Sequence, residues 1–396
     1  MTRSAGDSAC RSCGSKQSRI FHEIQRVPLH SCQLIESREA ALAAPTGMLR
    51  LAFCEACGFI QNDAFDPALI DYRTRYEDSQ CFSPRFQAFA HELAERLIAT
   101  YDLRGRDVLE IGCGKGDFLA LLCEAGGCRG VGIDPSYQTG RLEASAMSRL
   151  EFIPEFYSRD DRHRRFDLLC CRHTLEHLPA VRDFVSMVSE GLVESPGSAV
   201  FFEVPDVTRV LEELAFWDLY YEHCSYFSIG SLARLFRSCG FEVLRLSRDF
   251  DDQYLLLDAR RGDPRSGPRF SEEDDLERLA SAVRRFADEV PRFLVSWQQR
   301  LARLSESGRK AVLWGAGSKA VGFLSALDVG PEIGCVVDIN PHKQGMHLAG
   351  TGHRIVSPAF LKEYDPDLVI VMNSIYQDEI RADLAAMGLE PEVIGL

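Results

Sequence analysis

The stretch that decides the fold is VLEIGCGKGD at residues 108–117, followed by GVGID at 130–134. In the first segment a short apolar run leads into three glycines at alternate positions, which predicts a strand that ends in a tight turn. The second segment is again apolar and ends in Asp134, where a carboxylate can accept both hydroxyl groups of a ribose. The pattern therefore predicts neighbouring strands of an α/β sheet with a nucleoside-type ligand at their carboxyl ends.

The spacing of the glycines indicates which ligand. GxGxG, in place of the GxGxxG of NAD sites, favours S-adenosylmethionine (SAM), and an acidic residue just before the glycines can hold the amino group of its methionine part. The segment FDLLCCRHTLEHLP at 166–179 is typical of the next strand in class I methyltransferases. An NAD site and a plain strand-turn-helix are the alternatives. We predict SAM binding by five residues: Glu110, Gly112, Gly114, Gly116 and Asp134.

Outward from this turn, short apolar strands alternate with amphipathic helices from residue 107 to about 260. That alternation predicts the doubly wound α/β sheet of a class I methyltransferase. A stretch rich in Arg, Gly, Pro and acid at 260–275 marks a boundary, and a helix over about 273–307 leads into a second α/β series. We predict three parts: a zinc-binding segment 1–75, a methyltransferase domain 76–262 and a C-terminal Rossmann-like lobe 263–396.

Composition narrows the class of protein. The chain has 396 residues and a net charge of −14, and no basic face of the kind that binds nucleic acid is visible. No apolar run reaches the ~18–20 residues of a membrane span, and the N-terminal residues do not read as a signal peptide. We therefore expect a cytoplasmic enzyme with a small-molecule substrate, without nucleic-acid or membrane partners. The oligomeric state is left open.

Four of the 14 cysteines form two pairs, CRSC at 10–13 and CEAC at 54–57. Two such CxxC pairs offer four thiolates in a tetrahedron, the arrangement that a structural zinc ion prefers. The long gap between the pairs means that a small excursion, which includes Cys32, must loop out. Unliganded thiols, a redox pair and iron are the alternatives. We predict that zinc is bound by Cys10, Cys13, Cys54 and Cys57.

Taken together, these features resemble the zinc-containing sugar C-methyltransferases of deoxysugar pathways, such as those of tylosin, novobiocin and tetronitrose biosynthesis. The resemblance covers nearly the whole chain and is most specific at EVPD…WDLYYEHCSYFS, residues 203–228. It implies that His223 is the general base and that Glu222 and Tyr220 are the polar residues around it. It also implies that His177 and Tyr76 lie near the substrate. Tyr221 and the segment RYEDSQ at 75–80 depart from the family pattern and put the substrate in doubt.

The resemblance implies C-methylation of a nucleotide-linked keto-deoxysugar. A histidine suits removal of the acidified hydrogen next to a ketone near pH 7, and hydrogen-bond donors would hold the enolate oxygen. The alternative functions are O- or N-methylation of another natural-product or polysaccharide precursor, and a non-catalytic SAM-binding protein. A structural histidine is the alternative for His223 and for His177.

The C-terminal segment LWGAGSKAVG at 313–322 carries a second glycine turn, with Gly315, Gly317 and Ala320 in a GxGxxA pattern and Asp338 further on. One interpretation is a dinucleotide site. The other, which the resemblance favours, is a lobe that helps to hold the nucleotide part of a substrate or only completes the fold. Ser318, Lys319 and Lys343 are the candidates for phosphate contacts.

Overall fold

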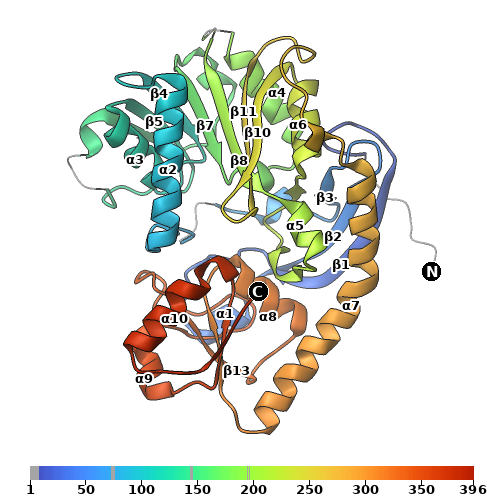
Figure 1. Cartoon of the computed structure of the whole chain (residues 1–396), viewed down its shortest axis with the longest axis vertical. Helices are drawn as coiled ribbons and strands as arrows, with labels where there is room; N and C mark the ends of the chain where they lie inside the picture. Colours follow the sequence, from blue (N-terminus) through green and yellow to red (C-terminus); the bar gives the residue numbers. More distant parts are fainter. Residues whose placement is uncertain (1–8, 73–75, 143–145, 194, 196) are drawn as a thin grey trace.

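The computed structural model describes residues 9–396 except 73–75, 143–145, 194 and 196, and it contains three sheets (Figure 1). The largest has seven strands in the order β10-β11-β8-β7-β4-β5-β6. All neighbours in it are parallel except β11, which runs antiparallel to both β8 and β10. This is the class I methyltransferase sheet that the sequence predicts. Its strands are β4 Asp107–Ile111, β5 Arg129–Ile133, β6 Leu150–Ile153, β7 Leu168–Arg172, β8 Ala199–Pro205, β10 Phe241–Asp249 and β11 Tyr254–Arg261.

Helices cover both faces of this sheet, because successive side chains on its strands point to opposite sides. On β7, Leu168 packs with α2 and α3, whereas Leu169 packs with α4 and α6. Phe201 and Phe202 on β8 divide in the same way. The two cores therefore follow directly from the near-continuous apolar strands. The helices are α2 Pro84–Tyr101, α3 Asp117–Gly126, α4 Val181–Gly191 and α6 Ile229–Ser238.

A four-stranded sheet joins the N-terminal segment to the methyltransferase part. Its strands are β1 Ser18–Pro28, β2 Thr46–Cys54, β3 Ile60–Asn62 and β9 Ser225–Tyr226. The loop between β1 and β2, with α1 Arg38–Leu42, reaches the C-terminal lobe, where Ile35 pairs with His347. This loop is the excursion between the cysteine pairs, and it connects the N-terminal sheet to the lobe.

The C-terminal lobe has a parallel sheet of five strands in the order β14-β13-β12-β15-β16. The long helix α7, Leu276–Glu306 with Pro291 inside it, runs along one edge of the molecule. It extends from the level of the seven-stranded sheet to that of the five-stranded sheet (Figure 1). The strands are β12 Ala311–Trp314, β13 Ile333–Val337, β14 Ile355–Val356, β15 Leu368–Val371 and β16 Glu392–Gly395; the helices are α8 Ser318–Leu327, α9 Leu361–Tyr364 and α10 Gln377–Ala386. Sequence reasoning missed all four strands of the N-terminal sheet, of which β1, β2 and β3 lie in a segment that the sequence pattern indicated to be irregular, and the short strands β6 and β16.

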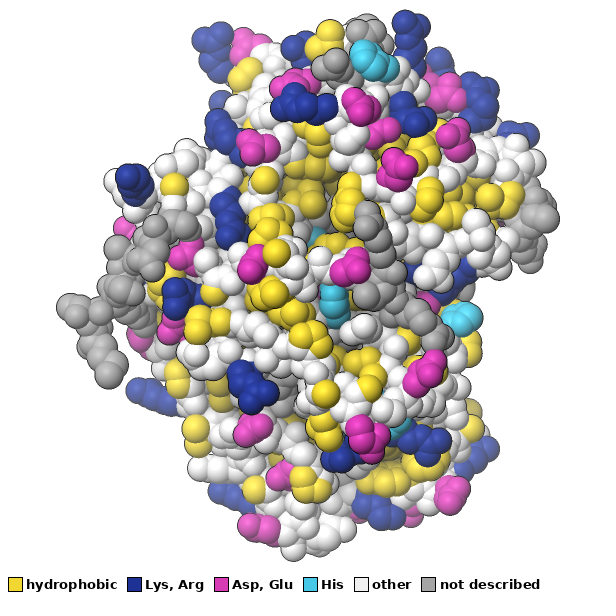
Figure 2. All heavy atoms as spheres, turned by 180° about the vertical axis from the view of Figure 1, so that it is seen from behind, with side chains coloured by type: hydrophobic (Ala, Val, Ile, Leu, Met, Phe, Trp, Pro, Cys, Tyr) yellow, Lys and Arg dark blue, Asp and Glu magenta, His cyan; other side chains and the backbone are white. Residues whose placement is uncertain are grey.

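The surface carries both signs of charge. On the face seen in Figure 2, Lys and Arg side chains are interspersed with Asp and Glu. Among the described residues, no helix is both long and apolar enough to span a membrane.

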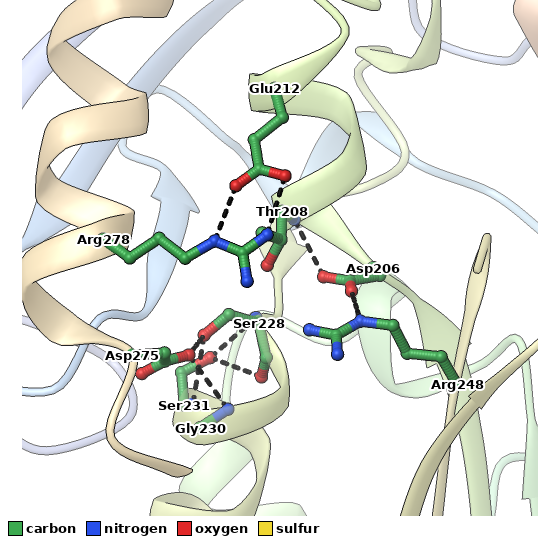
Figure 3. A network of polar contacts seen from close by, with 9 residues as sticks. All are labelled: Asp206, Thr208, Glu212, Ser228, Gly230, Ser231, Arg248, Asp275 and Arg278. Carbon is green, nitrogen blue, oxygen red and sulfur yellow. Dashed lines mark hydrogen bonds and ion pairs between the residues drawn. The ribbon is translucent and has the colours of Figure 1, made fainter. Parts of the chain in front are cut away.

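A polar junction fixes the start of α7 against α6 (Figure 3). The Asp275 carboxylate, just before α7, accepts hydrogen bonds from the Ser228 hydroxyl at 2.6 Å and the Gly230 N–H at 3.0 Å. Arg234 donates to its other oxygen at 2.7 Å. Nearby, an exposed ion pair joins Arg278 of α7 to Glu212 of α5, Val207–Glu212. Asp275 therefore satisfies buried donors, whereas the Arg278 pair lies in solvent.

Replacing Asp275 by Ala should lower the free energy of unfolding by about 2–4 kcal/mol, because three donors lose their acceptor in a half-buried place. Arg278→Ala is the matched control and should change it by less than about 1 kcal/mol, since exposed pairs contribute little. Urea unfolding followed by circular dichroism measures both. Equal losses in the two variants would contradict this account of the junction.

Candidate functional site

A cavity of 1260 Å³ lies where the carboxyl ends of the seven-stranded sheet face the C-terminal lobe. Its lining includes both glycine turns, the one after β4 and the one after β12. Ligands of open α/β sheets bind at the carboxyl ends of the strands. The cavity is therefore the candidate site.

The first glycine turn presents open backbone to this cavity. Gly112, Gly114 and Gly116 all have positive φ, at 70°, 54° and 85°. A Cβ on Gly112 would lie 1.8 Å from the Thr174 hydroxyl, whereas one on Gly114 would meet nothing within 4 Å. Gly112 and Gly114 line the cavity, but Gly116 packs against Phe152 and shapes the turn instead.

The two acidic residues of the predicted cofactor site also line the cavity. Asp134 accepts hydrogen bonds from the Gly114 N–H at 2.8 Å and from the backbone and hydroxyl of Ser136 at 2.7 Å, so it fixes the turn. Glu110 is buried, and its Oε2 has no hydrogen-bond partner among the described residues. Burial raises the pKa of Glu110 to about 8. A buried carboxylate with an open oxygen fits the cationic end of a ligand.

At the far side of the cavity, the Glu222 carboxylate is enclosed by donors. His30 Nδ1 lies 3.0 Å from Oε1, while Oε2 accepts from the Ser31 N–H at 2.8 Å, the Ser31 hydroxyl and the Tyr76 hydroxyl at 3.1 Å. Burial raises the pKa of Glu222, but the hydrogen bonds from His30 and Ser31 and the nearby His177 outweigh it and hold the pKa below its usual value. Both oxygens of Glu222 already accept hydrogen bonds, so this carboxylate fixes the positions of His30, Ser31 and Tyr76.

His223 lies beside this carboxylate in sequence but faces aromatic rings in space. Its ring centroid is 4.2 Å from that of Tyr220 and 4.7 Å from that of His177, and all three residues line the cavity. Burial lowers the pKa of His223 well below 6.5, and His177 and His173 add to the shift. His223 is therefore a neutral imidazole at pH 7, which can accept a proton. His177 Nδ1 lies 3.1 Å from the Tyr72 hydroxyl.

The structure thus brings together the five residues that the resemblance implies at the substrate end, since Tyr76, His177, Tyr220 and His223 line the cavity and Glu222 contacts Tyr76. Sequence reasoning missed the partners that come from distant segments. Tyr72 lies four residues before Tyr76, which is only a weak indication of a shared site. The sequence around His30 gives no indication of a functional role. Glu176 belongs to the same LEH motif as His177, so that motif is the signal that could have indicated it. The missed residues are His30, Ser31, Tyr72, His173 and Glu176.

The two departures from the family pattern fall in different places. Tyr221 is buried outside the cavity lining, where its hydroxyl accepts a hydrogen bond from the Asp66 N–H at 2.9 Å. That departure therefore concerns packing. In the segment RYEDSQ, by contrast, Tyr76, Asp78 and Ser79 all line the cavity.

The second glycine turn opens onto the same cavity through Gly315, Gly317, Ser318 and Lys319. Its Asp338 accepts a hydrogen bond from the Ala316 N–H at 2.8 Å, and the buried Lys343 ammonium lies 3.7 Å from Asp338. A lysine in this position competes with ribose hydroxyls for the carboxylate. Asp338 and Lys343 both line the cavity, so the two glycine turns open onto one shared space.

The four paired cysteines converge although they are far apart in sequence. Cys10 Sγ lies 3.6 Å from Cys57 Sγ, Cys13 Sγ lies 3.7 Å from Cys54 Sγ, and all four sulfur atoms lie within 4.8 Å of one another. A tetrahedral zinc ion with Zn–S bonds of about 2.3 Å needs sulfur atoms about 3.8 Å apart. The donor set therefore fits a closed metal site, and the four cysteines are not among the residues that line the cavity.

Two family models match the chain. One, described as a methyltransferase domain, matches residues 82–246, and one described as the C-methyltransferase C-terminal domain matches residues 269–390. The chain is also 29% identical over 389 residues to C-methyltransferase NovU of Streptomyces niveus. The matched region covers 94% of this chain and 90% of that protein.

Solved structures resemble a smaller part of the chain. The 1,6-didemethyltoxoflavin-N1-methyltransferase of Burkholderia thailandensis is 19% identical, covers 44% of this chain and 79% of its own, and has a TM-score of 0.34. The magnesium protoporphyrin IX methyltransferase of Synechocystis PCC 6803 is 18% identical, covers 45% of this chain and 84% of its own, and has a TM-score of 0.35.

Proposed function

We propose that this protein, an S-adenosylmethionine-dependent methyltransferase, methylates a carbon atom next to the ketone of a nucleotide-linked keto-deoxysugar. The observation that carries the proposal is the neutral, buried imidazole of His223 in the cavity that also holds the first glycine turn. The similarity to C-methyltransferase NovU, which extends over 94% of this chain, supports a carbon atom as the acceptor of the methyl group.

Glu110, Gly112, Gly114 and Asp134 are the residues that we propose to hold SAM, with Gly116 shaping the turn. When bound, SAM supplies an electrophilic methyl group on a sulfonium sulfur. The open oxygen of Glu110 suits the amino group of the methionine part, and Asp134 suits the ribose. The open side of Gly114 suits close approach of a ligand to the backbone.

His223 is the proposed base. It takes the proton from the carbon next to the ketone, and the electron pair of that C–H bond becomes the enolate. The enolate carbon then forms the new C–C bond to the methyl group, while the electron pair of the broken S–C bond stays on sulfur. His223 afterwards returns its proton to solvent. His177 and Tyr76 are the proposed donors to the enolate oxygen, and Tyr220 packs against the base.

Glu222 is proposed to position this machinery through Tyr76 and the 29–45 loop. The proposal also keeps the three-part division at 1–75, 76–262 and 263–396. In it, the C-terminal lobe holds the nucleotide part of the substrate near Ser318, Lys319 and Lys343, all of which line the cavity.

The test is a product assay with purified protein, SAM and a panel of nucleotide-linked 4-keto-6-deoxysugars. Mass spectrometry should detect one added methyl group, and NMR should locate it on the carbon beside the ketone. A methyl group on oxygen or nitrogen would keep the methyltransferase and discard the enolate step. No turnover of any member would refute this substrate class.

Replacing His223 by Asn should lower kcat by at least about 100-fold, because general-base catalysis contributes about 10²–10⁴ in rate. The affinity for SAM should stay unchanged, since His223 belongs to the substrate end of the cavity. Isothermal titration calorimetry checks the second point. Near-full turnover in this variant would remove His223 as the base.

SAM binding should tighten as pH rises from 6 to 7, by up to about tenfold, if Glu110 meets the ammonium group. With its pKa raised to about 8, Glu110 is protonated in the free protein and must lose a proton to pair with that cation. Glu110→Gln should bind more weakly at pH 7 and lose the pH dependence. A wild-type affinity that is constant over this range would separate Glu110 from the amino group.

We propose that Cys10, Cys13, Cys54 and Cys57 bind one structural zinc ion per chain. Elemental analysis of purified protein should find one equivalent of zinc and no iron. Cys13→Ser should lower the metal content and the thermal stability, because a closed tetrahedral site contributes directly to folding. Ser substitution of Cys239, which lies outside the cluster, is the control and should leave one equivalent bound.

A further inference from the structure

Glu176 is a buried carboxylate that the proposed function leaves without a role. It is 1% exposed, and neither carboxylate oxygen accepts a hydrogen bond within the described part of the chain. Its nearest charged partner is His173, whose Nδ1 lies 3.5 Å from Oε1. Burying a carboxylate without hydrogen bonds costs several kcal/mol. One positive neighbour at that distance leaves both oxygens without a hydrogen bond, so Glu176 can face a second positive charge that arises during the reaction.

The position of Glu176 identifies that charge. One oxygen of Glu176 and one ring nitrogen each of His177 and His223 lie within 4.8 Å of one another. All three residues line the cavity. Glu176 and His177 share the short 3-10 turn Leu175–His177 after β7, and His223 approaches them from the segment before β9. The carboxylate is therefore within direct electrostatic reach of the proposed base.

We propose that Glu176 is a positioning residue that stabilises the positive charge of His223 after it accepts the proton from the substrate carbon. The proposal rests on the proposed function, in which the C–H proton moves to His223 and its electron pair to the enolate. Before that transfer His223 is neutral. Afterwards it carries one positive charge, and an anion within about 4–6 Å favours that charged form.

A charged network of Glu203, Arg172 and His173 reaches Glu176 through His173. Glu203 forms a bidentate pair with Arg172 at 3.0 Å and an ion pair with His173 Nε2 at 2.7 Å. Burial lowers the pKa of His173, but the charges of Glu203 and Glu176 outweigh it and raise the pKa to about 9. His173 is thus cationic at neutral pH and also has a left-handed backbone with φ 46°. It anchors Glu176 without approaching the substrate base as a hydrogen-bond partner.

Four further titratable groups near Glu176 are weak acids that stay neutral at pH 7. Burial raises the pKa of each of them above its ordinary value, so they do not compete for its charge: Tyr72, Cys171, Tyr220 and Cys224. The remaining titratable rings against His223 are those of His177 and Tyr226. The same three ligand atoms also suit a divalent metal, but a metal would need the lone pair with which His223 takes the proton.

The test compares wild type with Glu176→Gln, which removes the charge and keeps the shape, and with Glu176→Asp, which keeps the charge. Histidine residues are labelled with ¹³C, and the His223 signal is assigned with the His223→Asn variant. In Glu176→Gln the titration midpoint of His223 should fall by about one pH unit or more relative to wild type. Glu176→Asp should stay closer to wild type. Identical midpoints for His223 in wild type and Glu176→Gln would overturn the proposal.

This readout needs no substrate, so it separates the role of Glu176 from the proposed function. If the sugar panel gives turnover, Glu176→Gln should also lower kcat more than it changes KM, and the acid limb of its pH profile should move to lower pH. A profile with the wild-type acid limb would overturn the role of Glu176 even though the protein methylates the sugar. If the panel gives no turnover, the proposed function fails, and the NMR titration still decides whether Glu176 faces the charge of His223.

Discussion

The arrangement of the cavity depends on the hydrogen bonds at the buried carboxylate of Glu222. Three segments that are distant in sequence meet at its two oxygens: the 29–45 loop through His30 and Ser31, the segment between β3 and α2 through Tyr76, and the segment before β9, which carries Glu222 itself. The Ser31 hydroxyl also bonds to Ser318 of the C-terminal lobe at 2.8 Å. An ionised, buried carboxylate is tolerated only when hydrogen bonds satisfy its lone pairs. The segments that donate to Glu222 must therefore all be in their correct positions at the same time.

That requirement explains the architecture around the cavity. The N-terminal sheet borrows β9 from the methyltransferase part, and its β1–β2 loop reaches the C-terminal lobe. The four cysteines close the base of the same sheet, at the end of β2. The residues 76–83 then bridge both lobes, since Glu77 bonds Arg141 on one side and Asn340 on the other. The cavity is built from three parts of the chain, and no one of them encloses it alone.

Charge in the cavity is arranged by burial and pairing. Glu110 and His223 are neutral at pH 7 because burial penalises their charged forms, whereas Glu203 and His173 are charged because each has a close partner of opposite sign. Neutral groups that face the cavity are ready to take up a charge from a ligand. Paired ones hold the framework. The same division separates the proposed base His223 from its sequence neighbour Glu222, whose carboxylate is held by hydrogen bonds.

The sequence by itself determined the local chemistry. The glycine turn, Asp134 and the apolar strands predicted the doubly wound sheet, because strand period, turn glycines and strand-end acids are properties of neighbouring residues. The paired cysteines indicated a four-thiolate site for the same reason, whereas only the family resemblance singled out the YYEH stretch at 220–223. Only the tertiary structure decided that His30 and Ser31 enclose Glu222, that Tyr221 packs outside the cavity, and that Glu176 lies close to His223 without accepting a hydrogen bond from the described residues. Those facts depend on contacts between segments separated by up to 192 residues, which no local pattern encodes.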